Sequence, residues 1–495
     1  DGTDFEEMAF FGSQSEATVA DGDAPSRLIF GTTSDGAGAA TEKMRLTSDG
    51  KLGIGTTSPV QKLHLSDGSS TAVYQKFSND TTGNTSGDGT TLGIDADGDF
   101  LINNLESKTI KLYTADTERF SIDSSGAATF AGTINNVGIS SNITNFSQSI
   151  LISNDAGTGT LDAASNNTGL GFEVFDDLTS GDNNTAVGCK ALDALTTGSQ
   201  NTALGDTSLS SLTTGDANTA LGYRAMLSSG TGVSDNTAIG RDALYNVTGE
   251  RNVAVGNYAL DANTSGNSNT AVGKDALSAN TTASNNVGIG RSALLVNTTG
   301  TRNTAVGTFA LDANTTANDN CAFGYNTLTD NTTGSQNTSF GQASLANNTT
   351  ANDNTALGYQ ALFTNTTGAQ NTAVGMGANT VGDRNVAVGA NALTTYNPST
   401  NEDGYNTAIG LNALFSDTTG TTNTALGAKT LEANTTGNGN VAVGYIALEA
   451  NTTGSTSTAV GQEALQKNTT ASGNVAVGYQ ALEENTSGEA NTAVG

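Results

Sequence analysis

Residues 269–285 read NTAVGKDALSANTTASN, and variants of this pattern recur from Asn167 to the end of the 495-residue chain. Copies begin at positions 167, 184, 201, 218, 236, 252, 269, 286, 303, 320, 337, 354, 371, 385, 406, 423, 440, 457, 474 and 491. The period is 17 residues with slips of one, except for a copy of 14 residues at 371 and one of 21 at 385. A fixed period over this length predicts a stacked repeat architecture.

Each position of the copy, numbered from its first residue, has a physical interpretation. Position four is always apolar, as at Val187, Leu204 and Phe340, and position two is mostly Thr or Val, which favour strands. Positions two and four then share one strand face, and the small residue at position three points the other way. A small residue at position three of every copy predicts that another backbone packs closely against this face of the strand. Position five is Gly in every copy, which suits a corner with positive φ.

The second half of the copy predicts a turn back to the next strand. Position nine is Leu in nearly every full copy and forms a second apolar ladder, while Asn-Thr-Thr-Gly, as at 297–300, is turn chemistry. A helical solenoid needs two helices and more than about 30 residues per repeat. The sequence therefore predicts a parallel β-solenoid, or β-roll, of 17-residue coils. Its 19 intervals, at about 4.8 Å per coil, give a roll roughly 90 Å long.

Composition supports a thin-cored, repetitive protein. The chain has 61 Gly, 5% aromatic residues, no Trp and 35% hydrophobic residues, so large side chains are scarce. Its formal net charge of -29 repels phosphate backbones, which argues against a nucleic-acid partner. Because one coil offers only about two large apolar side chains, each worth about 1.5–3 kcal/mol when buried, we expect three chains to share a core. The small-residue face is where we expect them to meet.

The repeat resembles the head of trimeric autotransporter adhesins, the YadA-like left-handed parallel β-roll. The 14-residue copy is the closest match: residues 371–389 read NTAVGMGANTVGDRNVAVG. The longer copies depart from that family by inserting Ala-Leu-x-x-Asn-Thr-Thr-Gly material. The resemblance implies a trimeric adhesive fibre.

The N-terminal third resembles shaft segments of phage tail fibres and related virion appendages. The residues that carry this likeness are 45–59 (RLTSDGKLGIGTTSP), 62–65 (KLHL) and 119–132 (RFSIDSSGAATFAG). The resemblance implies short strands interleaved among three chains. Alternation at 108–113 and Asp-Gly pairs at 49–50 and 97–98 independently predict strands and tight turns. We therefore predict an all-β fibre with shaft segments at 1–135, a transition at 136–165 and the β-roll at 166–495.

Candidate chemistry is sparse, and we expect no enzyme, cofactor or metal site. His64 is the only histidine and lies between two leucines, so packing in the shaft is the better interpretation. Asp176-Asp177 could serve acid–base chemistry, but solvated surface is favoured. Asp95-Ala-Asp-Gly-Asp99 resembles the start of a calcium loop with Glu106 at its twelfth place, yet no flanking helices are predicted.

Other residue types also favour structural roles. Cys189 and Cys321 are about eight coils apart, which excludes a disulfide between them within one solenoid. Asn-x-Thr triplets, such as those at Asn297 and Asn451, match glycosylation acceptors, but local backbone bonding explains their place in every turn. Thr ladders raise an ice-binding alternative, although position two also holds Val and Cys.

The expected function is structural and adhesive. We expect a phage tail fibre on the virion that binds a host cell-surface glycan or protein receptor and joins other virion tail proteins. Tyr223, Tyr258, Tyr359 and Tyr479 are candidates for stacking on sugars. A bacterial trimeric surface adhesin or extracellular filament is the alternative, and an enzyme such as a depolymerase comes third. The chain begins at Asp1 and stops within a copy, so we expect it to be a segment of a longer polypeptide.

Overall fold

The computed structural model describes the chain at residues 9–15, 25–33, 39–66, 73–77, 89–95, 97–105, 107–126, 128–130, 138–143, 146–153, 163–398 and 403–495. Every regular element in these ranges is a β-strand, which confirms the all-β prediction. None of the described segments is an apolar helix long enough to cross a membrane. The chain divides into two compact units, Asp1–Gly132 and Thr133–Gly495.

The first unit contains three small sheets. The largest has five strands in sequence order: β1 (Ala9–Ser15), β2 (Ser26–Thr32), β3 (Thr41–Leu46), β4 (Leu52–Ile54) and β5 (Leu63–Leu65). Its pairs are antiparallel except for the parallel pair β4–β5. The two other sheets are antiparallel and have three strands each: β6 (Val73–Phe77), β7 (Thr90–Ile94) and β8 (Phe100–Asn104); β9 (Ile110–Thr114), β10 (Thr117–Ile122) and β11 (Ala128–Phe130).

Local sequence signals in this unit correspond to observed elements. The alternating segment 108–113 was predicted as a strand, and β9 covers Ile110–Thr114. Gly50 and Gly98 lie in turns with φ of 73° and 91°, as the Asp-Gly pairs predict. In the first turn the Gly50 N–H donates to the Thr47 carbonyl at 2.9 Å, which closes the chain reversal between β3 and β4.

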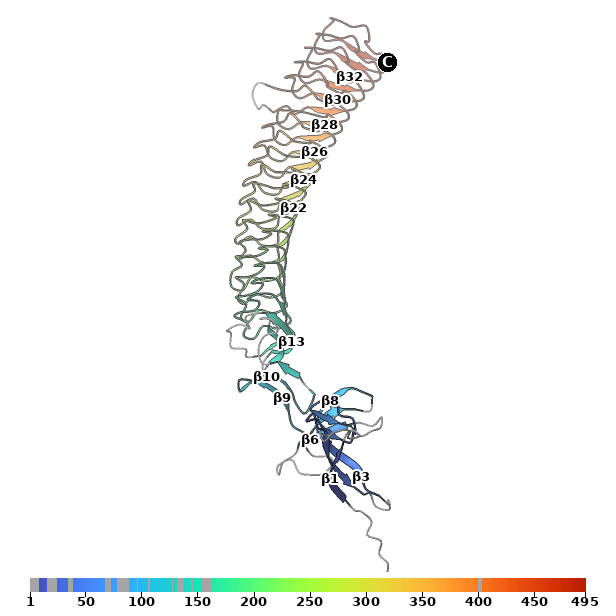
Figure 1. The fold of residues 1–495 in the computed structure, drawn as a ribbon. Helices are drawn as coiled ribbons and strands as arrows, with labels where there is room; N and C mark the ends of the chain where they lie inside the picture. The colour runs from blue at the N-terminus through green and yellow to red at the C-terminus, as the bar shows by residue number, and fades with distance from the viewer. Residues whose placement is uncertain are drawn as a thin grey trace, which may run out of the picture. The chain divides into compact units, whose positions relative to one another are not determined.

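The second unit is built on one sheet of 23 strands, β12 to β34, that runs along a solenoid (Figure 1). It begins with an antiparallel pair, β12 (Gly138–Ile143) and β13 (Phe146–Ser153), and all later pairs are parallel. The parallel strands are β14 (Ala164–Ser165), β15 (Thr168–Leu170), β16 (Thr185–Val187), β17 (Thr202–Leu204), β18 (Thr219–Leu221), β19 (Thr237–Ile239), β20 (Val253–Val255), β21 (Thr270–Val272), β22 (Val287–Ile289), β23 (Thr304–Val306), β24 (Cys321–Phe323), β25 (Thr338–Phe340), β26 (Thr355–Leu357), β27 (Thr372–Val374), β28 (Val386–Val388), β29 (Thr407–Ile409), β30 (Thr424–Leu426), β31 (Val441–Val443), β32 (Thr458–Val460), β33 (Val475–Val477) and β34 (Thr492–Val494).

The strand register follows the repeat, which confirms the parallel β-solenoid of 17-residue coils. Positions two, three and four of one coil pair with the same positions of the next, as in Thr304↔Cys321. The 14-residue and 21-residue copies keep this register, with Thr372↔Val386 and Val386↔Thr407. Differences in copy length are therefore absorbed in the turns and leave the sheet unchanged.

Position three, not position four, lines the inside of the coil. Ala271 at position three, Ala276 at position eight and Leu277 at position nine are fully buried and belong to one continuous core. Position three must be small because Leu277 fills the space opposite: a Cβ added at Gly288 would lie 3.2 Å from the Leu277 Cγ. The expectation that the small-residue face is where chains meet is therefore wrong, because that face points into its own coil.

The corners of the coil depend on left-handed backbone. The glycine at position five has positive φ as predicted, for example 141° at Gly307. Positions seven, nine and seventeen are also left-handed but carry side chains, as at Asp275 (58°) and Leu277 (52°). This costs about 1–2 kcal/mol per residue. It lets the Asp275 N–H bond back to Asn257 and the Leu277 N–H bond forward to Ala293, both at 3.0 Å, so that each coil is joined to both neighbours.

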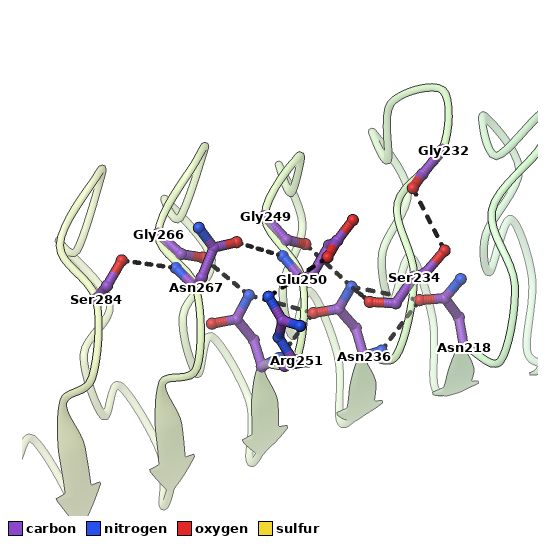
Figure 2. A network of polar contacts seen from close by, with 11 residues as sticks. Asn218, Gly232, Ser234, Asn236, Gly249, Glu250, Arg251, Gly266, Asn267 and Ser284 are labelled. Carbon is purple, nitrogen blue, oxygen red and sulfur yellow. Dashed lines mark hydrogen bonds and ion pairs between the residues drawn. The ribbon is translucent and has the colours of Figure 1, made fainter.

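Buried asparagines fill the rest of the interior. At position one, the Asn236 N–H donates to the Asn218 side-chain oxygen at 3.1 Å, and the Asn236 side-chain amide donates to the Gly249 carbonyl at 3.1 Å (Figure 2). A second ladder occupies position twelve, where the Asn280 amide donates to the Asn263 oxygen at 2.9 Å. Because each amide both donates and accepts, the ladders satisfy one another's buried polar groups along the coil axis.

Candidate functional site

The most extensive candidate surface is the outward side of the solenoid sheet. We define the outer face as the side chains at positions two and four of every copy from Asn167 onward. Position three points inward, so strand alternation places positions two and four outside. Parallel pairing of β15 to β34 then aligns them in two continuous rows, position two beside position two and position four beside position four.

The outer face is uncharged, and its position-four row is apolar, although the chain is strongly acidic. Position four is Val, Leu, Ile or Phe throughout, and position two is Thr, Val or Cys. Large side chains here are substantially exposed, including Leu204 at 45%, Phe340 at 43% and Leu357 at 49%. Phe323 and Phe340, in adjacent coils, stack with ring centroids 4.5 Å apart and an interplanar angle of 11°. An exposed apolar row of this length is typical of an interaction surface.

A second row follows each corner glycine. We define the position-six row as the side chains one residue past that glycine. In the N-terminal half this row and its neighbours form cation–π pairs: the Arg241 guanidinium lies 5.3 Å from the Tyr258 ring centroid, and that of Arg291 lies 4.5 Å from Phe309. Each pair joins side chains of two adjacent coils and so restrains the side chains of this row along the coil axis.

The tyrosines singled out as sugar-stacking candidates are ordered by the coil. Tyr223, Tyr359 and Tyr479 all occupy position six, and Tyr258 occupies position seven. All three position-six rings are exposed. Counting from each Asn at position one would have revealed this alignment from the sequence.

Two of the residues considered for catalysis and calcium binding, His64 and Asp95, make local hydrogen bonds with the backbone. His64 lies on β5, where its Nδ1 accepts a weak bond from the Val60 N–H at 3.4 Å. Asp95 caps the turn between β7 and β8, because its carboxylate accepts the N–H groups of Asp97 at 3.1 Å and Asp99 at 2.8 Å. Glu106 lies outside the described residues.

The acidic pair on the solenoid is not part of a metal-binding cluster. Asp176 is half-buried and Asp177 is exposed, and the Asp177 backbone N–H bonds to the Asp193 carbonyl at 2.9 Å. Within the described part of the chain, no group of three or more His, Cys, Asp or Glu side chains is arranged to hold a metal ion.

The cysteines and the Asn-x-Thr triplets also belong to the scaffold. Cys189 and Cys321 are both free and half-buried, as expected, and burial raises the pKa of each thiol. Asn297 and Asn451 are fully buried in the position-twelve ladder, where each amide donates to a local carbonyl at 3.0 Å. Buried amides of this kind are inaccessible to glycosylation, so the backbone-bonding interpretation is the correct one for both.

Comparison of the chain with protein-family models, with curated proteins and with solved structures found no match.

Proposed function

We propose that this chain is one strand of a trimeric, adhesive fibre of a phage virion, a tail fibre that projects from the particle and contacts the host surface. The observation that carries the proposal is the outer face, an uncharged surface with an exposed apolar row at position four, repeated over the parallel strands β15 to β34. At about 4.8 Å per coil it is roughly 90 Å long. Surfaces of this size on soluble proteins are normally covered by a partner.

Copies of the same chain suit the outer face best. Two chains that each carry a net charge of -29 repel one another wherever their acidic surfaces meet. The outer face has no charged residue at position two or four in any copy, so it is the side on which like chains approach at least electrostatic cost. The rows of two identical chains also have the same spacing between coils, so the outer faces of two solenoids can align along their whole length. Association through this face replaces our earlier expectation of contact through the small residues.

The first unit supports the same proposal independently. This unit leaves many large apolar side chains exposed, among them Phe11 (68%), Val60 (68%) and Phe100 (68%). Large apolar side chains that stay exposed together in this way are typical of a surface that a partner covers. Interleaving with the same segments of two further chains would cover these residues, as the resemblance to fibre shafts implies.

Adhesion follows from repetition. A solenoid presents the same surface at each coil, so weak contacts with a host glycan or protein add up through avidity. Other virion tail proteins would anchor the fibre. A bacterial trimeric surface adhesin or extracellular filament is the second candidate, because the same solenoid would serve there and the 14-residue copy resembles that family.

Electron cryo-microscopy of the native particle or filament that carries the chain tests this proposal. Three-fold density at a tail appendage, with the outer faces turned toward the axis, is the expected result. Density on a cell envelope would replace the virion with the adhesin alternative. Single, unassociated solenoids would overturn the trimer.

A further inference from the structure

The position-six row changes character halfway along the solenoid. Its N-terminal half includes Asp206, Arg241, Lys274 and Arg291. From Thr308 to Tyr479 it contains no charged residue: the row reads Thr308, Tyr325, Gln342, Tyr359, Met376, Ala390, Leu411, Ala428, Tyr445, Gln462 and Tyr479. In a chain of net charge -29, an uncharged row of this length favours an uncharged ligand.

Within this half the same triplet occurs twice. Tyr325, Gln342 and Tyr359 occupy three successive coils, and Tyr445, Gln462 and Tyr479 occupy three successive coils further on. All four rings are exposed, at 50%, 48%, 50% and 63% in chain order, and both glutamines are exposed. Each triplet therefore presents two aromatic faces with an amide between them.

Backbone hydrogen bonds fix the spacing within each triplet. In the first, the Ala343 N–H donates to the Tyr325 carbonyl at 3.0 Å and the Gln360 N–H donates to the Gln342 carbonyl at 3.1 Å. The second has the same bonds, from Glu463 to Tyr445 at 3.1 Å and from Gln480 to Gln462 at 2.9 Å. Two coils at about 4.8 Å each place the tyrosines of a triplet about 10 Å apart. A spacing set by the scaffold reduces the entropy lost on binding.

We infer that the two Tyr–Gln–Tyr triplets are binding sites for a neutral, extended, β-1,4-linked glycan that lies along the solenoid axis. In such a glycan alternate sugars are flipped, so equivalent ring faces recur at every second sugar, over a distance that matches the tyrosine spacing. Each tyrosine ring stacks on one sugar. The glutamine amide, which both donates and accepts, bonds the hydroxyls of the sugar between them. The inference rests on the proposed adhesive function and names the class of receptor.

Polar neighbours fit this ligand. The Gln462 amide donates to the Glu463 carboxylate at 2.9 Å, which orients its carbonyl oxygen as an acceptor for a hydroxyl. Position seven, next to the row, adds Asn326, Gln360, Asn412 and Gln480 as further amides. Amides and aromatic faces, with few charges, suit a neutral polyhydroxylated ligand better than an anionic one.

Isothermal titration of the full chain with cellohexaose, and with hexagalacturonate as an anionic counterpart, tests the inference. We expect saturable binding of cellohexaose only. Tyr359→Ala and Tyr479→Ala should each weaken one of the two sites about tenfold and leave the other unchanged, and the double variant should lose tight binding at both. Tyr359→Phe should retain both sites, because the aromatic face supplies the contact. Circular dichroism of each variant checks that the solenoid is intact.

Tyr223→Ala is the matched control. Tyr223 also occupies position six and is 48% exposed, as Tyr359 is, but it lies between Asp206 and Arg241 rather than in a triplet. Its replacement should leave cellohexaose binding unchanged. Absence of cellohexaose binding, equal binding of hexagalacturonate, or an equal loss in Tyr223→Ala would overturn the inference. None of these results bears on three-fold density in the particle, so failure of the glycan site and failure of the fibre proposal are distinguishable.

Discussion

The Asn434 side-chain amide donates a hydrogen bond to the Asp417 carboxyl group, 3.1 Å away, within the buried ladder at position twelve. Asp417 also accepts the Gly420 N–H at 2.9 Å. The asparagines at position twelve of other copies donate hydrogen bonds as well as accept them, and the Asn434 amide donates to the Gly437 carbonyl at 3.2 Å. An ionised Asp417 has no proton to donate, so the neutral acid is the better substitute for an amide. Burial accordingly raises the pKa of Asp417 to about 8.

Replacing Asp417 by Asn should stabilise the solenoid in a pH-dependent way. In the unfolded chain this carboxyl group ionises near its ordinary pKa of 3.8, whereas in the fold it stays protonated up to about 8. The native state therefore loses stability as pH rises between these values and loses no more above them. The advantage of Asp417→Asn should be small at pH 4, grow to pH 8 and then level off, as measured by the unfolding midpoint of both proteins.

The exposed Asp319 supplies the control for this prediction. The hydrogen bond from Arg302 lowers the pKa of Asp319. The ionised Asp319 carboxylate therefore stabilises the fold slightly, whereas ionisation of Asp417 destabilises it, and this small stabilisation is lost as pH falls. Asp319→Asn should thus lower stability slightly at neutral pH. An advantage of Asp417→Asn that does not change with pH, or shrinks as pH rises, would show that the ladder tolerates the charge.

The corner glycines should not tolerate a side chain. Gly307 has φ of 141°, and an added Cβ would lie 2.2 Å from the Gly324 carbonyl oxygen of the next coil. Because that contact is with backbone, relief requires the two coils to separate. We expect Gly307→Ala to lower the free energy of unfolding by about 3 kcal/mol or more, measured by chemical denaturation.

Gly439→Ala is the comparison for that corner. Gly439 also has positive φ, 65°, but the nearest atom to an added Cβ is the Thr456 Cγ2 at 3.7 Å. Gly439→Ala should lower the free energy of unfolding by only about 1 kcal/mol, the cost of placing a side chain on left-handed backbone. Equal costs at the two sites would refute close stacking of the corners.

The position-one ladder should be the most sensitive polar feature of the fold. Asn286 accepts the Asn303 N–H at 2.9 Å and donates to the Gly300 carbonyl at 2.8 Å, and it is fully buried. Asn286→Ala leaves the buried Asn303 N–H without its acceptor, which should cost about 1–3 kcal/mol. The Gly300 carbonyl loses one of its two amide donors and keeps the other, Asn297 at 3.0 Å. Hydrogen exchange should localise the loss to the flanking coils, because solenoid repeats interact mainly with their neighbours. Thr282→Ala, on the exposed turn of the preceding coil, should leave exchange unchanged.

A charge on the outer face should separate associated chains. Leu357 at position four is 49% exposed, so Leu357→Glu disturbs no core contact within its own coil. It introduces a carboxylate where chains are proposed to meet, and sedimentation velocity should show dissociation. Thr350→Glu adds the same charge at an exposed turn position and should leave association intact. Dissociation by both variants would indicate general charge repulsion instead of a specific face.

The repeat was sufficient to predict the fold but not the direction of its side chains. Period, strand position and corner glycines were all readable, because Gly at position five and the β-branched residue at position two have local causes. Which strand face is inside depends on what lies opposite, and at position three of one coil, Gly288, the residue opposite is Leu277 of the same chain. The core also holds buried amides such as Asn286, to which the sequence analysis assigned no role.

The backbone at position nine illustrates the same limit. Leu277 has φ of 52°, a conformation that a leucine avoids unless its surroundings impose it. Two features hold Leu277 in this conformation: its side chain is buried in the core, and its N–H donates to the Ala293 carbonyl in the next coil at 3.0 Å. Neither is visible until the coils are stacked. By contrast, the position-six triplets could have been found by aligning the copies.

The mass of the 495-residue chain in solution, measured by light scattering across a range of concentrations, tests the central claim most directly. Association of three solenoids through their uncharged outer faces predicts a species of three times the chain mass that persists on dilution. A species of the single-chain mass at all concentrations would contradict the claim and leave the outer face without a partner of its own kind.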